Sequence, residues 1–324
     1  MRVSIIVPNY NHARFLRQRI DTILAQTFQD FELILLDDCS TDDSRSILSS
    51  YSSDPRVRLD FNDANSGSTY KQWNKGVRLA RCEYVWIAES DDYADERFLE
   101  RLVPALDSKP EVVFVTCRSL HVGEDGQPQP YAEIDLPYLV RYDTTIEVDG
   151  REECRNHFVS INTVYNASSV LFRKSVYDQV GGADETFRFC GDWKLWAAMA
   201  LSGRIVYVSK ELNYRRVHHA TVTSGSEREG LAQAEYLRVM RWLLGKVRPT
   251  DSARQGMTQV VRWSWTPAVS SWHLPLRTRF SILRDAIAVD PSNTLRGVIP
   301  AGLGALRRKF VRHWHSIQSA RRSA

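Results

Sequence analysis

The chain has 324 residues, of which 43% are hydrophobic and 25% charged, proportions of an ordinary globular protein that exclude a disordered or collagen-like chain. The formal net charge of +4 gives no reason to expect a nucleic-acid partner. Nowhere do 18 apolar residues run together, so the sequence predicts no membrane-spanning helix.

Strands and helices are predicted to alternate over the first 120 residues. Residues 3–7 and 31–36 are short apolar runs typical of buried strands, and residues 13–26 between them form an amphipathic helical pattern. Further helices are predicted over 44–51, 70–80 and 97–106, and further strands over 57–61, 84–88 and 112–117. This alternation predicts an α/β fold with a mostly parallel sheet flanked by helices, and such sheets bind ligands beyond the carboxyl ends of their strands.

The second half of the chain is less regular. Residues 121–143 are rich in Pro, Gly and acidic residues and are predicted to form a long loop. Strands over 168–172 and 205–208, a glycine turn at 181–182 and a helix over 193–201 follow. After about residue 225 the chain becomes rich in Trp and Arg, with helical patterns over 231–244 and 277–289, and we expect a domain boundary there.

Acidic residues gather at two strand ends. The sequence ESDD at residues 89–92 follows the apolar strand YVWIA, and adjacent carboxylates there repel unless a cation lies between them. A divalent ion such as Mg²⁺ or Mn²⁺ would resolve this repulsion, whereas the alternative is that Asp91 or Asp92 merely caps the next helix. Asp37 and Asp38 end an earlier strand and are predicted to face the same cleft, while Asp42 and Asp43 are predicted to cap the helix at residue 44.

Several motifs together resemble one known family. VSIIVPNYN, LLDDCSTDDS, NSGSTYKQWNKGV and YVWIAESDD, followed by VGGADETF, GDWKLW and YRRVHHATVTS, look like a family 2 glycosyltransferase over roughly residues 2–225. The resemblance implies a GT-A fold and an inverting, metal-dependent transfer of a sugar from a nucleotide diphosphate sugar to an acceptor hydroxyl. UDP is the favoured nucleotide, Mn²⁺ or Mg²⁺ the cofactor, and a carbohydrate or lipid-linked molecule in surface polysaccharide synthesis the expected acceptor.

The resemblance also assigns residues to the nucleotide sugar. Pro8, Asn9 and Tyr10 are expected to line the nucleobase pocket. Asp38 is expected to accept a hydrogen bond from the base, with Asp37 as the second candidate, and Asp91 to bind the ribose. Four further residues are expected to border the nucleotide: Asn65, Gly67, Lys71 and Asn74.

The remaining assignments concern the cation, the base and the acceptor. Asp92 and His218 are expected to bind the metal, although the adjacent His219 makes the histidine assignment ambiguous. Asp192 matches the family's general base, which would take the proton of the acceptor hydroxyl; a helix N-cap is the alternative. The acceptor side is expected to include Gly182, Asp184 and Trp193. The family pattern is broken at Glu89, where Asp is commoner, and at Gly191, where many relatives carry an acid.

These assignments predict two domains. Residues 1–225 would form the catalytic domain, with a nucleotide-binding part over about 1–118 and an acceptor-side part over about 119–225, and residues 226–324 a helical, basic C-terminal extension. That extension ends in Arg and Lys residues interleaved with Phe and Trp, which favours peripheral contact with an anionic membrane. A solvated tail or a contact between copies of the chain is the alternative. Five dispersed cysteines without metal-ligand spacing fit a reducing cytoplasm.

Two other functions are weighed against this one. A nucleotidyltransferase also uses a nucleotide cleft and acidic metal ligands, but VPNYNHARF lacks the glycine-rich phosphate loop expected of that class after the first strand. A catalytically degenerate nucleotide-binding scaffold is suggested only by Glu89 and Gly191, and the four acids Asp38, Asp91, Asp92 and Asp192 argue against it.

Overall fold

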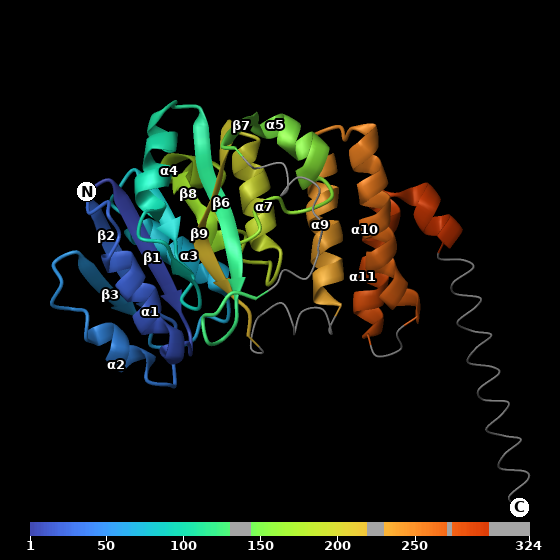
Figure 1. Ribbon diagram of the computed structural model, residues 1–324. Helices are drawn as coiled ribbons and strands as arrows, with labels where there is room; N and C mark the ends of the chain where they lie inside the picture. Colours follow the sequence, from blue (N-terminus) through green and yellow to red (C-terminus); the bar gives the residue numbers. More distant parts are fainter. Residues whose placement is uncertain (130–143, 219–229, 271–273, 298–324) are drawn as a thin grey trace, which may run out of the picture. The chain divides into compact units, whose positions relative to one another are not determined.

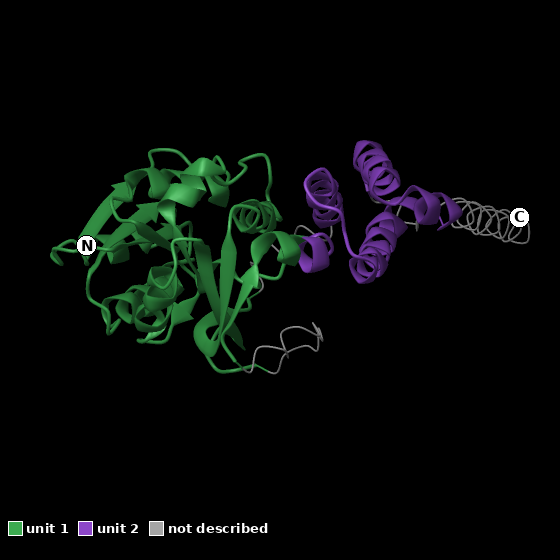
Figure 2. Ribbon diagram, turned by 90° about the horizontal axis from the view of Figure 1, so that it is seen from above, with its two compact units in different colours: residues 1–154, 162–221 green, residues 155–161, 222–324 purple. Residues whose placement is uncertain are grey.

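The computed structural model describes residues 1–129, 144–218, 230–270 and 274–297. The chain divides into two compact units (Figure 2). Unit 1 comprises Met1–Cys154 and Asn162–Thr221, and unit 2 comprises Arg155–Ile161 and Val222–Ala324. Unit 2 thus includes a short segment from the middle of the chain, which the sequence analysis did not anticipate.

Four parallel strands form one half of the sheet in unit 1 (Figure 1): β1 (Val3–Asn9), β2 (Phe31–Asp37), β3 (Val57–Phe61) and β4 (Tyr84–Ile87). Their spatial order is β3-β2-β1-β4. Asn9 pairs with Asp37 and Asp37 with Phe61, so the carboxyl ends of three strands lie at one edge. The residues after these ends therefore face a common region.

The other half of the sheet is mixed in direction. It contains β5 (Tyr93–Ala94), β6 (Val112–Val122), β7 (Ile146–Asp149), β8 (Val170–Arg173) and β9 (Arg204–Arg216). β8 runs antiparallel to both β4 and β6, and β9 runs parallel to β6 but antiparallel to β5 and β7. The α/β fold with helices flanking the sheet is confirmed. The long β9 ends beside β5, which directly follows residues 89–92.

Helices cover both faces of the sheet. Strand side chains alternate between the two faces, so each face presents apolar residues against which helices pack. α1 (Ala13–Leu24), α2 (Ser44–Ser49) and α4 (Phe98–Asp107) share a buried cluster with Val3, Ile5 and Val7 of β1. α3 (Thr69–Leu79) packs against the other side of β1, where a Cβ at Gly76 would overlap the Ile6 side chain. A glycine is needed at this close approach of helix and strand.

Shorter elements complete unit 1: α5 (Gly150–Glu153), the 3₁₀ turn η2 (Ala167–Ser169), α6 (Lys174–Gln179) and α7 (Gly191–Ala200). The π-helical turn η1 (Cys154–Phe158) begins at the last residue of unit 1's first segment. Gly181 and Gly182 both have positive φ, as the predicted turn requires. Of the predicted loop over 121–143, residues 130–143 lie outside the described part of the chain.

Unit 2 is helical, with α9 (Leu231–Leu244), α10 (Asp251–Ser270) and α11 (Leu276–Val289). The predicted helices over 231–244 and 277–289 are confirmed. Among the described residues, no helix is both long and apolar enough to cross a membrane.

Candidate functional site

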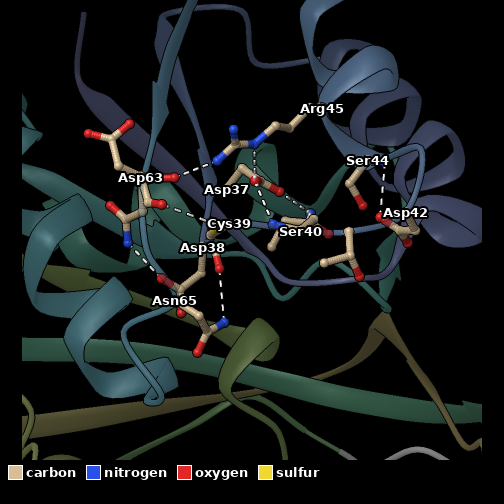
Figure 3. A network of polar contacts seen from close by, with 12 residues as sticks. Asp37, Asp38, Cys39, Ser40, Asp42, Ser44, Arg45, Asp63 and Asn65 are labelled. Atoms are coloured by element: carbon tan, nitrogen blue, oxygen red, sulfur yellow. Dashed lines mark hydrogen bonds and ion pairs between the residues drawn. The ribbon is translucent and has the colours of Figure 1, made fainter.

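The carboxylates of Asp37 and Asp38 point to different partners (Figure 3). Asp37 is fully buried and accepts hydrogen bonds from the Asn9 amide at 3.0 Å, the Ser40 backbone N–H at 2.9 Å and Arg45 Nε at 2.8 Å. Burial alone would raise the pKa of Asp37, but the donors, led by Arg45, lower it below its usual value. Asp37 therefore ties the end of β2 to β1 and α2.

Asp38 fixes the loop that leads into α3. Its carboxylate accepts from Asn62 Nδ2 at 2.6 Å, Gln72 Nε2 at 2.9 Å, and both the backbone N–H and the hydroxyl of Ser66 at 2.9 and 2.7 Å. With four protein donors and 4% exposure, this carboxylate is engaged by the protein itself. The structure gives it the role of ordering residues 62–72.

Three residues expected to border the nucleotide lie at the start of α3. The Asn65 amide donates to the Asp38 carbonyl at 2.9 Å, and its side-chain oxygen accepts the Gly67 N–H at 2.8 Å. Gly67 has φ of 71° and is exposed, so a side chain there would be strained although nothing lies within 4 Å. The exposed Lys71 ammonium donates to the Ser66 carbonyl at 3.2 Å. Of the three predicted nucleobase residues, Pro8 and Asn9 are buried, whereas Tyr10 is 46% exposed.

The fourth such residue, Asn74 of α3, contacts the turn over 181–185. Its amide donates to the Ala183 carbonyl and to Glu185, both at 2.9 Å, and its oxygen accepts from Tyr177 at 2.6 Å. A Cβ at Gly182 would approach the Asn74 oxygen to 2.7 Å. Asp184 pairs with Lys194 of α7. Asn74, Gly182 and Asp184 together hold the turn over 181–185 between α3 and α7.

Glu89, the departure from the family pattern, is held by α3. Its Oε1 accepts from Trp73 Nε1 at 2.6 Å, and its backbone N–H donates to Ser168 Oγ at 3.0 Å. Burial, reinforced by the charge of Asp91, raises the pKa of Glu89 to about 8.

The Asp92 carboxylate is buried and accepts hydrogen bonds from three protein groups. Its Oδ2 accepts from Ser168 Oγ at 2.7 Å and Asn166 Nδ2 at 3.0 Å, and its Oδ1 accepts the Arg216 backbone N–H at 2.9 Å. Burial, followed by the charge of Asp91, raises the pKa of Asp92. These bonds join the end of β4 to η2 and to the end of β9, and they engage both oxygens of the carboxylate that the sequence predicted to bind the metal.

The side chain beside His218 is Asp91. The distance between Asp91 Oδ2 and His218 Nε2 is 3.0 Å, and the His218 side chain is only 1% exposed. Although burial would raise the pKa of Asp91, the hydrogen bond with His218 and the nearby His12 lower it. His12, His218 and Asp91 each offer a ligand atom, and these atoms lie within 4.8 Å of one another, the one such group among the described residues.

The chemistry of this group fits a divalent cation. Imidazole nitrogen and carboxylate oxygen are both ordinary ligands of Mn²⁺ and related ions. Burial also lowers the pKa of His12, which favours the neutral, metal-binding form of its ring. His219 lies outside the described residues, so only His218 of the pair is placed.

Two arginines near the acidic segment were missed by the sequence analysis. Arg216 is 3% exposed, and its guanidinium donates to the carbonyls of Asp91, Gly123 and Glu124 and to the Gln18 side chain. Arg19 is fully buried and lies 4.9 Å from the Trp86 ring centroid, and its guanidinium has no hydrogen-bond partner within the part of the chain that the structure describes. Burial lowers the pKa of Arg19 to about 10, against the charges of Asp92, Asp91 and Glu89. The sequence does contain a signal for Arg19: it is a basic residue on the apolar face of the first helix, three residues after Leu16.

Asp192 lies in the first turn of α7. Its Oδ2 accepts from Asn162 Nδ2 at 3.1 Å. The start of the helix is held by Tyr70 of α3, whose hydroxyl accepts from the backbone N–H groups of Gly191 at 2.9 Å and Asp192 at 3.3 Å. A Cβ at Gly191 would lie 2.5 Å from the Tyr70 ring, so an acid at this position would displace Tyr70. Trp193 is 2% exposed and belongs to the core.

One line of contacts connects Asp192 with the acidic segment. The Tyr70 and Trp73 rings pack edge to face with centroids 5.2 Å apart, and Trp73 binds Glu89. Helix α3 therefore links the start of α7 to the end of β4 within unit 1.

Comparisons with known proteins agree on one family. A family model described as glycosyl transferase family 2 matches residues 4–181. Glycosyltransferase GlyG of Streptococcus pneumoniae serotype 4 is 28% identical over 225 residues, which are 66% of this chain and 70% of GlyG.

Two solved structures share the fold. A crystal structure of Staphylococcus aureus TarS residues 1–349 in complex with UDP-GlcNAc has a TM-score of 0.71 and 18% identity, covering 95% of this chain and 90% of that one. TarS is named a poly(ribitol-phosphate) β-N-acetylglucosaminyltransferase, and its sequence is 30% identical over 149 residues, 45% of this chain and 26% of TarS. The mannosyltransferase PcManGT of Pyrobaculum calidifontis, in complex with GDP-Man and Mn²⁺, has a TM-score of 0.61 and 16% identity. The match covers 98% of this chain and 84% of PcManGT.

These likenesses confirm the predicted GT-A type fold with C-terminal helices. The family model covers more than half of the chain, which therefore belongs to glycosyl transferase family 2, the nucleotide-sugar glycosyltransferases.

Proposed function

We propose that this family 2 glycosyltransferase transfers a sugar from a UDP-sugar to an acceptor hydroxyl with inversion at the anomeric carbon. Family membership supports the reaction class. The fold shared with TarS, whose structure holds UDP-GlcNAc, supports UDP as the nucleotide. The observation that carries the proposal is the pairing of Asp91 with His218 at the end of β4, where a nucleotide diphosphate is expected.

Asp91 and His218 would hold a divalent cation, with Asp91 replacing Asp92 in the metal assignment. Such an ion, when bound, offsets the negative charge that grows on the leaving diphosphate. Asp92 would act as a positioning residue, because its hydrogen bonds to Ser168, Asn166 and Arg216 fix the backbone that carries Asp91 and His218.

The nucleotide would lie along the β1 and β2 ends and the start of α3. Tyr10 offers an exposed aromatic face for the base. Asp38 would order the loop before α3 and the first turn of α3, which brings Gly67 and Lys71 toward the phosphates. Because the Asp38 carboxylate already has four protein donors, direct contact with the base would require some of these to exchange.

Asp192 would be the general base. Its carboxylate would take the proton of the acceptor hydroxyl while the acceptor oxygen forms a bond to the anomeric carbon and the bond to the diphosphate breaks. Asn162 would orient the carboxylate, and Tyr70 would hold the helix turn that carries it.

The acceptor would be a carbohydrate or a lipid-linked glycan in surface polymer synthesis. The action of TarS on poly(ribitol-phosphate) supports a polyhydroxyl surface polymer. The basic C-terminal residues would bring the enzyme to a membrane that carries such acceptors. On α11 of unit 2, Leu276 and Phe280 are 66% and 70% exposed next to exposed Arg277, which supports contact of that unit with an anionic lipid surface.

The test combines thermal stabilisation with turnover of the full chain. UDP-, GDP- and dTDP-sugars are compared with and without Mn²⁺, because ligand binding to the native state raises the melting temperature. Asp192→Asn should keep the Mn²⁺-dependent shift given by the UDP series and lose about 100-fold or more in donor turnover. Asp91→Asn should lose the Mn²⁺-dependent part of the shift.

Asp43→Asn is the matched control, since Asp43 is exposed and its side chain caps no helix. It should behave as the wild type. No shift with any nucleotide would favour the degenerate scaffold, and equal loss of the shift in both active-site variants would contradict the division of roles between Asp91 and Asp192.

A further inference from the structure

His12 lies beside the Asp91 and His218 pair but has no role in the function proposed above. It follows the end of β1 and precedes α1. Its ring meets that of His218 edge to face, with centroids 5.7 Å apart. Three separate parts of the chain therefore bring two imidazoles and one carboxylate to one point: the ends of β1, β4 and β9.

The spacing of these groups suits a single ion. Ligand atoms about 2.1 Å from an octahedral ion are about 3.0 Å apart when adjacent and about 4.2 Å apart when opposite. The Asp91 Oδ2 to His218 Nε2 distance is 3.0 Å, and all three ligand atoms lie within 4.8 Å of one another. The 4.8 Å limit exceeds the spacing of opposite ligands by about 0.6 Å, so small movements of the side chains would bring all three into coordination distance.

The surroundings of His12 prepare its ring for coordination. Its Nδ1 lies 2.8 Å from the hydroxyl of Ser90, which is 1% exposed. When this hydroxyl accepts the proton on Nδ1, Nε2 keeps a free lone pair, which is the usual arrangement of a metal-binding histidine supported by a hydrogen bond. Ser90 lies next to Asp91 in the sequence, so the support and the carboxylate ligand move together.

We propose that His12 is a third protein ligand of the cation and that the site selects a first-row transition ion, such as Mn²⁺ or Co²⁺, over Mg²⁺. Mg²⁺ prefers oxygen ligands and binds imidazole poorly, whereas transition ions accept imidazole readily. Two imidazoles and one carboxylate therefore favour the transition ion. This inference rests on the proposed function, because it deepens the cation site assigned there.

Binding of Mn²⁺ alone to the full chain, with and without UDP, tests the inference. Electron paramagnetic resonance measures free Mn²⁺ in a titration, and its pulsed form detects nitrogen atoms bonded to the ion. The wild type should show two histidine nitrogens. His12→Ala should show one nitrogen, a Mn²⁺ affinity at least tenfold weaker and a Mg²⁺ affinity changed less than threefold, measured by competition.

His121→Ala is the matched control, because His121 is a half-buried histidine of the same unit that stacks on Tyr165 outside the cluster. It should keep both nitrogens and the wild-type affinity. His12→Asp should bind Mn²⁺ well and discriminate less against Mg²⁺, since an oxygen ligand replaces an imidazole. If His12→Ala does not fold, the number of bound nitrogens and the preference for Mn²⁺ over Mg²⁺ are measured in His12→Asp and His12→Gln instead.

The outcomes separate this inference from the function proposed above. Wild-type Mn²⁺ affinity and two nitrogens in His12→Ala would overturn the inference alone and leave His12 as a residue packed on Phe15. Absence of Mn²⁺ binding to the wild type, with or without UDP, would overturn the cation site as a whole. If the wild type binds Mn²⁺ but shows no donor turnover, the result would count against the proposed reaction and not against the role of His12.

Discussion

Asp91 and Asp92 show how neighbouring identical residues acquire different roles. Both are acidic and adjacent, so nothing in the sequence ESDD distinguishes a ligand from a buried acceptor. The structure gives Asp92 three hydrogen-bond donors and places Asp91 against His218. The pKa of Asp92 is raised by burial and by the charge of its neighbour, while the pKa of Asp91 is lowered by its histidine partner despite its burial. Environment, and not residue type, separates the two.

A pH prediction belongs to Asp184. Burial alone would raise the pKa of this carboxyl, but hydrogen bonds from Lys194 and Thr186 lower it to about 2. A lowered pKa means that the contribution to stability is complete above about pH 4 and is lost as the pH falls through about 2. In thermal unfolding between pH 6 and pH 2, Asp184→Asn should be less stable at pH 6 by about 1 kcal/mol or less and should lose less stability on acidification than the wild type.

Asp178→Asn is the control for this measurement. Asp178 also pairs with a lysine, Lys174, but its side chain is 56% exposed, so the substitution should change stability little at any pH. If the thermal stability of Asp184→Asn depends on pH as that of the wild type does, the ion pair with Lys194 is not coupled to folding.

At the scale of elements, α3 connects the two halves of unit 1. It carries Gln72 toward Asp38, Trp73 toward Glu89, Asn74 toward the turn over 181–185 and Tyr70 toward the start of α7. The Tyr70 hydroxyl receives two N–H groups that the first turn of a helix leaves without an internal partner. This explains why Gly191, and no acid, precedes Asp192, since the Tyr70 ring occupies the space of a side chain at 191.

Tyr70→Phe should therefore act through Asp192. Without the hydroxyl, the N–H groups of Gly191 and Asp192 lose their acceptor, at a cost of about 1–3 kcal/mol. We expect a lower urea midpoint and a fall in kcat of about tenfold or more with KM for the donor little changed, because the turn that carries the base is loosened.

Tyr177→Phe provides the comparison, as Tyr177 is a buried tyrosine of the same unit whose hydroxyl binds Asn74 instead. It should lower the urea midpoint similarly but affect kcat less. Equal effects on kcat from both variants would mean that Tyr70 contributes only to stability.

For the whole molecule, the prediction concerns the basic end of the chain, which lies outside the described residues. Residues 307–324 include six Arg and Lys residues and no acid. Their removal should leave transfer to a soluble acceptor intact and reduce sedimentation with vesicles of phosphatidylcholine and phosphatidylglycerol several-fold, since each basic residue near an anionic surface contributes about 1 kcal/mol.

Vesicles of phosphatidylcholine alone are the control, and neither form of the protein should bind them strongly. Replacing the six basic residues by Gln keeps the length of the chain and should reproduce the truncation. Unchanged sedimentation with the anionic vesicles would discard the membrane proposal.

The sequence by itself determined most of the succession of strands and helices in the first 120 residues, the resemblance to the family, and the segments that meet at the strand ends. These depend on local periodicity and on motifs, which a single chain displays directly. The helix over 231–244 and the parallel strands β1 to β4 were predictable for this reason.

Only the tertiary structure decided what each polar side chain contacts. The reversal of β8, the membership of residues 155–161 in unit 2, and the assignment of Asp91, His12 and His218 to one point all depend on contacts between distant parts of the chain. Asp38 and Asn74 likewise gained partners 24 to 111 residues away, which no spacing in the sequence indicates. Hydrogen bonding and burial act through space, and the free energy of a charged group is set by these long-range neighbours.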